Sequence, residues 1–144
     1  MEDVGPIHLA AWFGLNGVIE RLITKGRCHT PIVKQNGHRQ NHSGHNTIHL
    51  AAINGHLETV KYLASFTDTP NQGNNLGVTP IHFAIKRGHL DIVKCLSGFT
   101  DTPNSSDIWG DTPIEYAAKY GHLDIVKFLV NFTDAPNAPN NGGY

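Results

Sequence analysis

The sequence has few of the features that mark secreted or membrane-spanning proteins. Among its 144 residues are two cysteines, and only 16% of the residues are charged. Cys28 and Cys95 lie far apart, so no disulfide framework is expected, and two unpaired thiols suit a reducing compartment. No apolar run is long enough to span a membrane, and residues 1–4 lack the basic and apolar regions of a signal peptide. We therefore expect a soluble intracellular protein, cytoplasmic or alternatively nuclear.

The sequence also lacks an excess of charge of either sign. Its formal net charge is -1 at pH 7, whereas a protein that neutralises phosphates usually carries a clear basic excess. Lys61, Lys94 and Lys127 share one repeat position, which predicts a solvated outer row and not a nucleic-acid stripe. We expect neither nucleic acid nor a membrane as partner.

Motifs for catalysis and phosphate binding are missing as well. The glycines do not occur as GxGxxG or GxxxxGK, the loops that hold phosphates. No Ser-His-Asp order stands in a suitable context. We therefore predict no catalytic residue, no cofactor and no enzyme activity.

What the sequence does contain is one unit in four copies. Ile48, Ile81 and Ile114 are 33 residues apart, and the glycines, histidines and phenylalanines of the same segments repeat at the same step. A further copy opens the chain as PIHLAAWFG. Its Ile7 precedes Ile48 by 41 residues, which leaves about eight extra residues between the first two copies.

Each copy begins with a signal for the start of a helix. Threonine caps free amides and proline fits the first helical position, as at Thr79-Pro80 and Thr112-Pro113. Glu115 follows Thr112 at the capping-box spacing. Asn46 takes the capping role in the second copy, and Gly5-Pro6 gives the first copy a weaker start.

Each copy then has a stop and a second helix. A glycine in the left-handed conformation should end the first helix, and a second helix with one apolar side should follow, for example Leu90 to Leu96. The segment FTDTPN or FTDAPN and the Asn/Gly-rich stretch behind it form the loop to the next copy. Because one helix pair cannot bury its apolar side alone, the copies must stack. We predict an all-α solenoid of four stacked helix-turn-helix units with Asn/Gly-rich turn-tip loops.

The predicted boundaries describe one domain over residues 1–144. Repeat 1 covers about 4–27, a long connector 28–44, repeat 2 about 45–73, repeat 3 about 74–106 and repeat 4 about 107–140. At the amino end Asn16, Glu20 and Arg21 are expected to face water. The carboxyl end carries Phe128 and Val130 where other copies are less apolar, so either the chain is a fragment of a longer array or this end self-associates.

The strings TPIHFA and GHLDIVKCL resemble the ankyrin repeat family, whose signature is T-P-L-H-x-A at a 33-residue period. The resemblance covers about residues 4–140. It departs from the family where FTDTPN replaces the usual Gly-Ala pair, where Asn16-Gly17 opens the second helix of copy one, and where Glu115 replaces the usual histidine. It implies recognition of a protein partner through a concave surface, built from the turn tips and the exposed side of each first helix.

Carried over position by position, the resemblance implies two sets of partner-binding residues. The turn-tip candidates are His42, Ser43, His45, Asn75, Leu76, Val78, Ile108, Trp109 and Asp111. The helix candidates are the two residues before each helix-ending glycine: Trp12, Phe13, Ile53, Asn54, Lys86, Arg87, Lys119 and Tyr120.

The contents of this surface favour a binding role. Aromatic side chains and arginine are the usual anchors of protein interfaces, and a basic-aromatic groove suits a segment that carries acidic and apolar residues. Two alternatives remain: Trp12 and Phe13 cover the open amino end of the stack, or Trp109 is a single exposed aromatic without a role.

Ten histidines are unusual for this length. Those inside the repeats are expected to be structural, as hydrogen-bond partners of the capping loop or as part of the turn after the glycine. His38, His42 and His45 have the spacing of zinc ligands on one side of a helix. The surrounding segment is rich in Asn, Gln and Gly, which favours a solvent-exposed, pH-sensitive loop instead.

Three functional hypotheses follow. The first is a scaffold or adaptor that binds a protein partner through the concave groove. The second is a structural or assembly segment of a larger protein. The third is a metal- or pH-responsive element in the histidine-rich connector.

Overall fold

The computed structural model describes residues 6–24, 44–67, 69–100 and 103–132. In chain order its helices are α1 (Pro6–Trp12), α2 (Asn16–Thr24), α3 (Thr47–Ile53), α4 (Leu57–Ala64), α5 (Pro80–Arg87), α6 (Leu90–Ser97), α7 (Pro113–Lys119) and α8 (Leu123–Leu129), followed by a 3-10 turn, η1 (Val130–Phe132). No strand occurs within these ranges. None of the helices described is long and apolar enough to cross a membrane.

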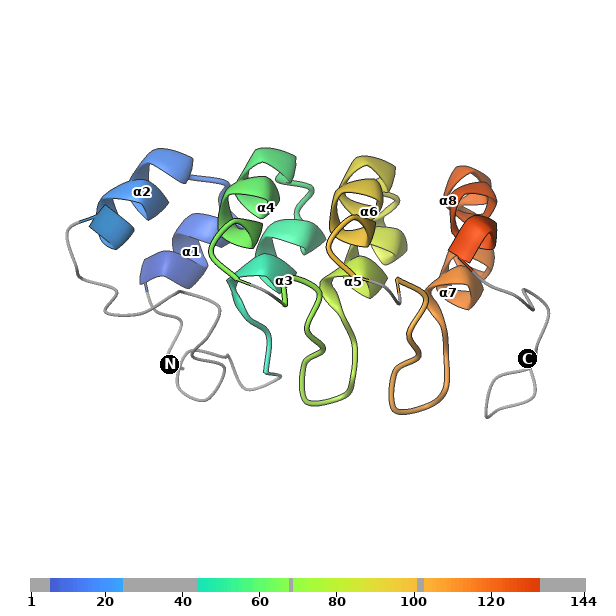
Figure 1. Ribbon diagram of the computed structural model, residues 1–144. Coiled ribbons are helices and arrows are strands. Elements are labelled where there is room, and N and C mark those ends of the chain that lie inside the picture. Colours follow the sequence, from blue (N-terminus) through green and yellow to red (C-terminus); the bar gives the residue numbers. More distant parts are fainter. Residues whose placement is uncertain (1–5, 25–43, 68, 101–102, 133–144) are drawn as a thin grey trace.

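The helices form four pairs in a row (Figure 1). The inner helices α1, α3, α5 and α7 make one layer, in which each contacts the next, and the outer helices α2, α4, α6 and α8 make the other. The turn tips project from the inner layer (Figure 1). The prediction of an all-α repeat solenoid is confirmed. The predicted connector 28–44 lies almost wholly outside the described residues.

The core runs along the stack between the two layers. Valine and leucine side chains of the outer helices are fully buried at Val60, Val93 and Leu96. They belong to one core with equally buried alanines of the inner helices, such as Ala51 and Ala84. Alanine lets two inner helices approach closely, and the dry core this creates supplies the main stabilisation of the fold.

The inner helices α3, α5 and α7 begin with reciprocal capping hydrogen bonds. Asn46 Oδ1 accepts from the backbone amides of Ile48 and His49, both at 3.0 Å, and His49 Nδ1 accepts from the Asn46 amide at 3.1 Å. His82 does the same for Thr79, also at 3.1 Å. In α7 the carboxylate of Glu115 accepts from the amide of its capping threonine at 2.7 Å, as predicted. Histidine and glutamate are thus two versions of one capping box.

The same histidines also join one repeat to the next. Because Nδ1 accepts a backbone amide, the ring proton lies on Nε2. His49 Nε2 then donates to the carbonyl of Val78 at 2.9 Å, and His82 Nε2 to that of Asp111 at 3.4 Å. The prediction that these histidines are structural is confirmed, and each bond ties an inner helix to the turn tip of the following repeat.

The departure from the family pattern at FTDTPN has a structural reason. Asn71 Oδ1 accepts from the amide of Ile81 at 3.0 Å, and Asn104 Oδ1 accepts from the amide of Ile114 at 2.9 Å. The asparagine of the loop therefore caps an otherwise unpaired amide in the first turn of the next inner helix. A Gly-Ala pair has no side-chain acceptor for this purpose.

Stacked repeats approach each other most closely at the glycines that end the inner helices. Gly14 has φ +67°, and a Cβ there would lie 2.7 Å from Nδ1 of His56 in the next repeat. Gly88 has φ +78°, with the His122 ring 2.8 Å from the Cβ site. These positions need glycine both for the left-handed conformation and for the space that the histidine ring takes. The prediction that this second set of histidines is architectural is confirmed.

One polar pair interrupts the apolar contact between outer helices. Asn16, expected to face water, is half-buried, and its side-chain oxygen accepts from the hydroxyl of Thr59 at 2.5 Å. Thr59 is 1% exposed. The equivalent pair between the next two repeats is Leu57 and Ile92, so the first junction uses a hydrogen bond where the next one uses apolar contact.

We expect Thr59→Val to lower the free energy of unfolding by about 1–2 kcal/mol, because the shape is kept while Asn16 loses its partner in a half-buried site. The double variant Asn16→Leu/Thr59→Ile, which copies the next junction, should recover this loss and can exceed the native stability. Urea unfolding measures both. Additive losses in the double variant would show that the pair is not coupled.

Candidate functional site

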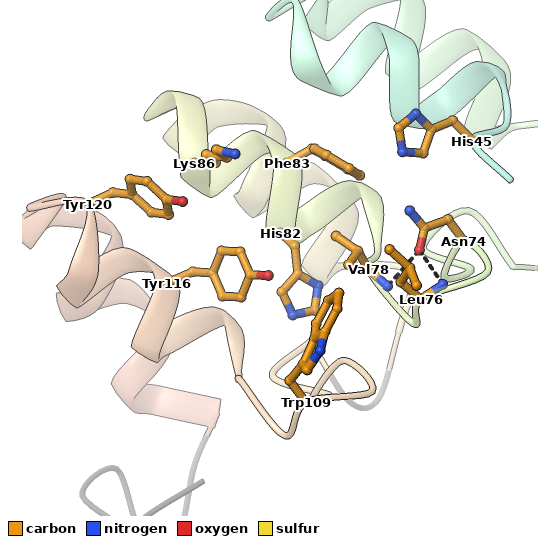
Figure 2. A pocket seen from close by; sticks show the side chains of 10 residues that line it. All are labelled: His45, Asn74, Leu76, Val78, His82, Phe83, Lys86, Trp109, Tyr116 and Tyr120. Atoms are coloured by element: carbon orange, nitrogen blue, oxygen red, sulfur yellow. Dashed lines mark hydrogen bonds between the residues drawn. The ribbon is translucent and has the colours of Figure 1, made fainter. Parts of the chain in front are cut away.

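A groove of about 230 Å³ lies between the inner helices α5 and α7 and the turn tips before them (Figure 2). We call it the α5–α7 groove. Its lining residues are His45, Asn74, Leu76, Val78, His82, Phe83, Lys86, Trp109, Tyr116 and Tyr120.

The turn tips hold their shape through one acidic or amide side chain each. Asn74 Oδ1 accepts from the amides of Leu76 at 2.9 Å and Val78 at 3.0 Å (Figure 2). Asp107 Oδ1 accepts from Trp109 and Asp111 in the same way, at 2.9 and 3.0 Å. A side chain that accepts two amides of its own turn fixes the backbone that carries the exposed residues.

The tips are also joined to each other and to the helix behind them. The amide of Ile108 donates to the carbonyl of Leu76 at 3.0 Å, so neighbouring tips are in contact. The hydroxyl of Tyr116 donates to Asp107 Oδ2 at 2.9 Å, which ties α7 to its own tip. Burial, and then the bond to Asp107, raise the pKa of Tyr116 well above its usual value. The hydroxyl therefore stays protonated and acts as a donor throughout the physiological range.

Aromatic rings form the walls of the groove. The ring of Phe83 meets the edge of His45, with centroids 4.9 Å apart, and the ring of Tyr116 meets His82 at 4.8 Å. Trp109 projects from the tip beside them (Figure 2) and remains 52% exposed. Edge-to-face contacts of this kind hold the wall rings in place, while the exposed ring of Trp109 is available to a ligand.

The rim of the groove is basic. Lys86 Nζ lies 5.8 Å from the centre of the Tyr120 ring, and Lys119 Nζ lies 6.0 Å from the same centre. Both lysines and the neighbouring Arg87 are exposed. The carboxylate of Asp107, in contrast, is 6% exposed and already bonded within the tip. Two ammonium groups over one ring favour an anionic partner group between them.

The structure gathers some of the predicted residues and separates others. Those that line the α5–α7 groove are His45, Leu76, Val78, Lys86, Trp109 and Tyr120. Arg87, Ile108 and Lys119 are exposed near it, while Trp12 and Phe13 are exposed on the first repeat. Ile53 and Asp111 are half-buried. His38 and His42 lie outside the described residues.

Two predicted positions differ from the expectation of an exposed side chain. Val78 is 7% exposed: it lines the groove, and its carbonyl accepts from His49 Nε2. Asn54 donates its side-chain amide to the carbonyl of Trp12 at 3.2 Å. Asn54 therefore contributes to the stacking of the repeats.

Sequence reasoning missed Phe83 and Tyr116 as lining residues. They lie one helical turn before Lys86 and Tyr120 respectively, on the same face of the inner helix. The sequence carried a usable signal: this repeat position changes from leucine to aromatic in the last two copies. It also missed Asn74, whose role depends on the turn that its own side chain builds.

The hypothesis of a metal site can be compared with the part of the chain that the structure describes. Within those residues, no three side chains of the metal-binding types come together. His45 is instead stacked on His49, with ring centroids 5.5 Å apart. Burial lowers the pKa of His45, which favours its neutral form as a wall of the groove.

Comparison with known families agrees with this architecture. A family model described as ankyrin repeats (3 copies) matches residues 7–102 and 70–140. No curated protein matches the chain.

The buried histidines make stability depend on pH. Burial lowers the pKa of His49 from 6.5 to about 3, against the opposing effect of its bond to Val78, and burial lowers that of His82. Because the unfolded chain binds protons that the folded chain excludes, stability is complete above pH 6.5 and falls as the pH drops from there towards 3. We expect His49 alone to lower the free energy of unfolding by about 2 kcal/mol as the pH falls from 6.5 to 5.

Thermal unfolding of the intact chain and of the variant His49→Gln across this pH range tests whether His49 causes the loss of stability in acid. Glutamine can still accept at the capping box but does not titrate, so the variant should show a shallower loss in acid. An unchanged profile in His49→Gln would contradict the assignment.

Proposed function

The chain belongs to the ankyrin repeat family, and from this membership we propose that it is a scaffold or adaptor that binds a protein partner through the α5–α7 groove. Ankyrin repeats are generally modules for protein–protein interaction, and the fold has no catalytic role of its own. The proposal accordingly assigns neither a reaction nor a cofactor.

The observation that carries the proposal is the set of aromatic side chains on a rigid frame. Phe83, Trp109, Tyr116 and Tyr120 come together at one place, and of these four only Tyr116 packs against the buried core. Trp109 in particular is held by a tip whose backbone is fixed by Asp107. Anchored aromatic rings lose little conformational freedom on binding, which is why they dominate the energetics of interfaces.

The charges of the rim specify the chemistry of the partner. Lys86, Arg87 and Lys119 favour a carboxylate, and the aromatic walls favour an apolar side chain next to it. A volume of about 230 Å³ holds a side chain and not a folded element. We therefore propose an extended or helical segment in which an acidic residue adjoins a large apolar one.

A second candidate function, assembly through the carboxyl end, is favoured by a separate observation. Leu123, Val130 and Phe132 are exposed there. Exposed apolar side chains at the end of a repeat stack are the usual mark of a missing neighbour.

Capture from cell lysate with the intact chain and with Trp109→Ala/Tyr120→Ala tests the groove. A partner should bind the intact chain and bind the double variant at least about tenfold more weakly, as expected for the loss of two anchors. Phe99→Ala removes an exposed aromatic on another part of the surface and is the control. The captured protein is then purified and its dissociation constant measured. Equal affinity for all three chains would contradict the groove assignment.

Charge reversal separates binding from packing. We expect Lys86→Glu/Lys119→Glu to weaken the same complex and to reduce its dependence on salt, with the melting temperature nearly unchanged, since both side chains are exposed. Lys94→Glu/Lys127→Glu makes an equal change of charge on the outer helices and should bind normally. A collapse of stability in the first variant would show that these lysines serve packing.

A further inference from the structure

The junction between repeats 1 and 2 defines which positions face a neighbour. On the side of repeat 2, the His56 ring lies over Gly14 and the Asn54 amide meets the Trp12 carbonyl. Thr59 meets Asn16 in the same contact. The positions of Asn54, His56 and Thr59 thus face the preceding repeat, and those of Gly14 and Asn16 face the following one.

At the amino-terminal end of the stack, the residues at the positions of Asn54, His56 and Thr59 are apolar and exposed. Phe13 stands at the position of Asn54 and is 61% exposed, Leu15 at that of His56 is 48% exposed, and Val18 at that of Thr59 is 44% exposed. In repeats 3 and 4 the last position is Ile92 and Ile125, each fully buried. We call Phe13, Leu15 and Val18 the amino face.

At the carboxyl-terminal end of the stack, the residues at the positions of Gly14 and Asn16 are uncovered. Gly121 has φ +76°, and a Cβ built there meets nothing within 4 Å, whereas Gly14, Gly55 and Gly88 each lie against a histidine ring. Leu123 is 64% exposed, while its equivalents Leu57 and Leu90 pack partly against the core. We call Gly121 and Leu123 the carboxyl face.

We propose that the carboxyl face binds the amino face of a second copy of this chain, so that copies join head to tail. In this contact Leu15 of the docking copy lies over Gly121 and Val18 lies against Leu123, as His56 lies over Gly14 and Thr59 against Asn16 within one chain. The interface is heterologous, so it leaves a free face at each end and allows a row of copies to grow.

A second copy fits this surface for a physical reason. The carboxyl face has the pattern that repeats 2 and 3 present to the next repeat, a left-handed glycine followed two residues later by a leucine, as at Gly55 and Leu57 or Gly88 and Leu90. The amino face supplies the matching half with apolar side chains at all three of its positions. Leucine over Gly121 gives up the hydrogen bond that His56 Nε2 donates to the carbonyl of Trp12 at 2.9 Å and gains apolar burial in exchange. The α5–α7 groove is lined by no residue of either face.

Two blocking variants test the contact. Val18→Glu places a charge on the amino face and Leu123→Glu places one on the carboxyl face; both sites are exposed, so the folded monomer should keep its melting temperature. In sedimentation velocity the intact chain should grow in mass with concentration without a fixed end point, and each variant alone should remain monomeric. An unpaired charge in the contact should raise the dissociation constant by roughly a hundredfold or more.

The decisive sample is an equal mixture of the two variants. Leu123→Glu still has an amino face and Val18→Glu still has a carboxyl face, so the mixture should form a one-to-one dimer that grows no further. Phe99→Glu, outside both faces, should assemble like the intact chain. A monomeric intact chain at the highest concentration reached, a monomeric mixture, or continued assembly of either variant alone would overturn the proposal.

Discussion

The contact on which the rest of the structure depends is the bond from the histidine of one inner helix to the turn tip of the next repeat. His49 and His82 each have two tasks, since one ring nitrogen completes the cap of their own helix and the other holds a carbonyl of the following tip. A helix pair cannot bury its apolar side alone. These bonds set the position at which the next pair must stack, and the buried histidine is favourable only while both nitrogens are bonded.

The groove is a consequence of this arrangement. Because the tips are fixed by the histidines from behind and by Asn74 or Asp107 from within, Trp109 can project from irregular backbone and still have a defined place. Tyr116 adds a further connection between helix and tip. The result is an exposed aromatic surface on a hydrogen-bonded support, which suits the recognition of a partner segment.

The regular contact between repeats also explains why the two ends of the stack are candidate surfaces for assembly. Each repeat carries one half of the interface on each side, so a stack of any length exposes one unmatched half at either end. In this chain both halves are apolar, at Val18 and at Leu123. Polar residues at these positions would have closed the ends. The same geometry that makes the fold extendable therefore supports the proposal that copies assemble through these ends.

The sequence by itself determined the repeat length, the helix starts at Asn46, Thr79 and Thr112, and the glycine stops, because these depend on a few neighbouring residues and on a fixed period. It also located the surface that carries the groove. Only the tertiary structure decided which residues share that groove: Phe83 and Tyr116 meet Trp109 across two repeats, and Val78 is turned inward by a bond from His49. Such contacts depend on how one repeat is rotated against the next. That rotation follows from the packing of whole helices and has no signature in the local sequence.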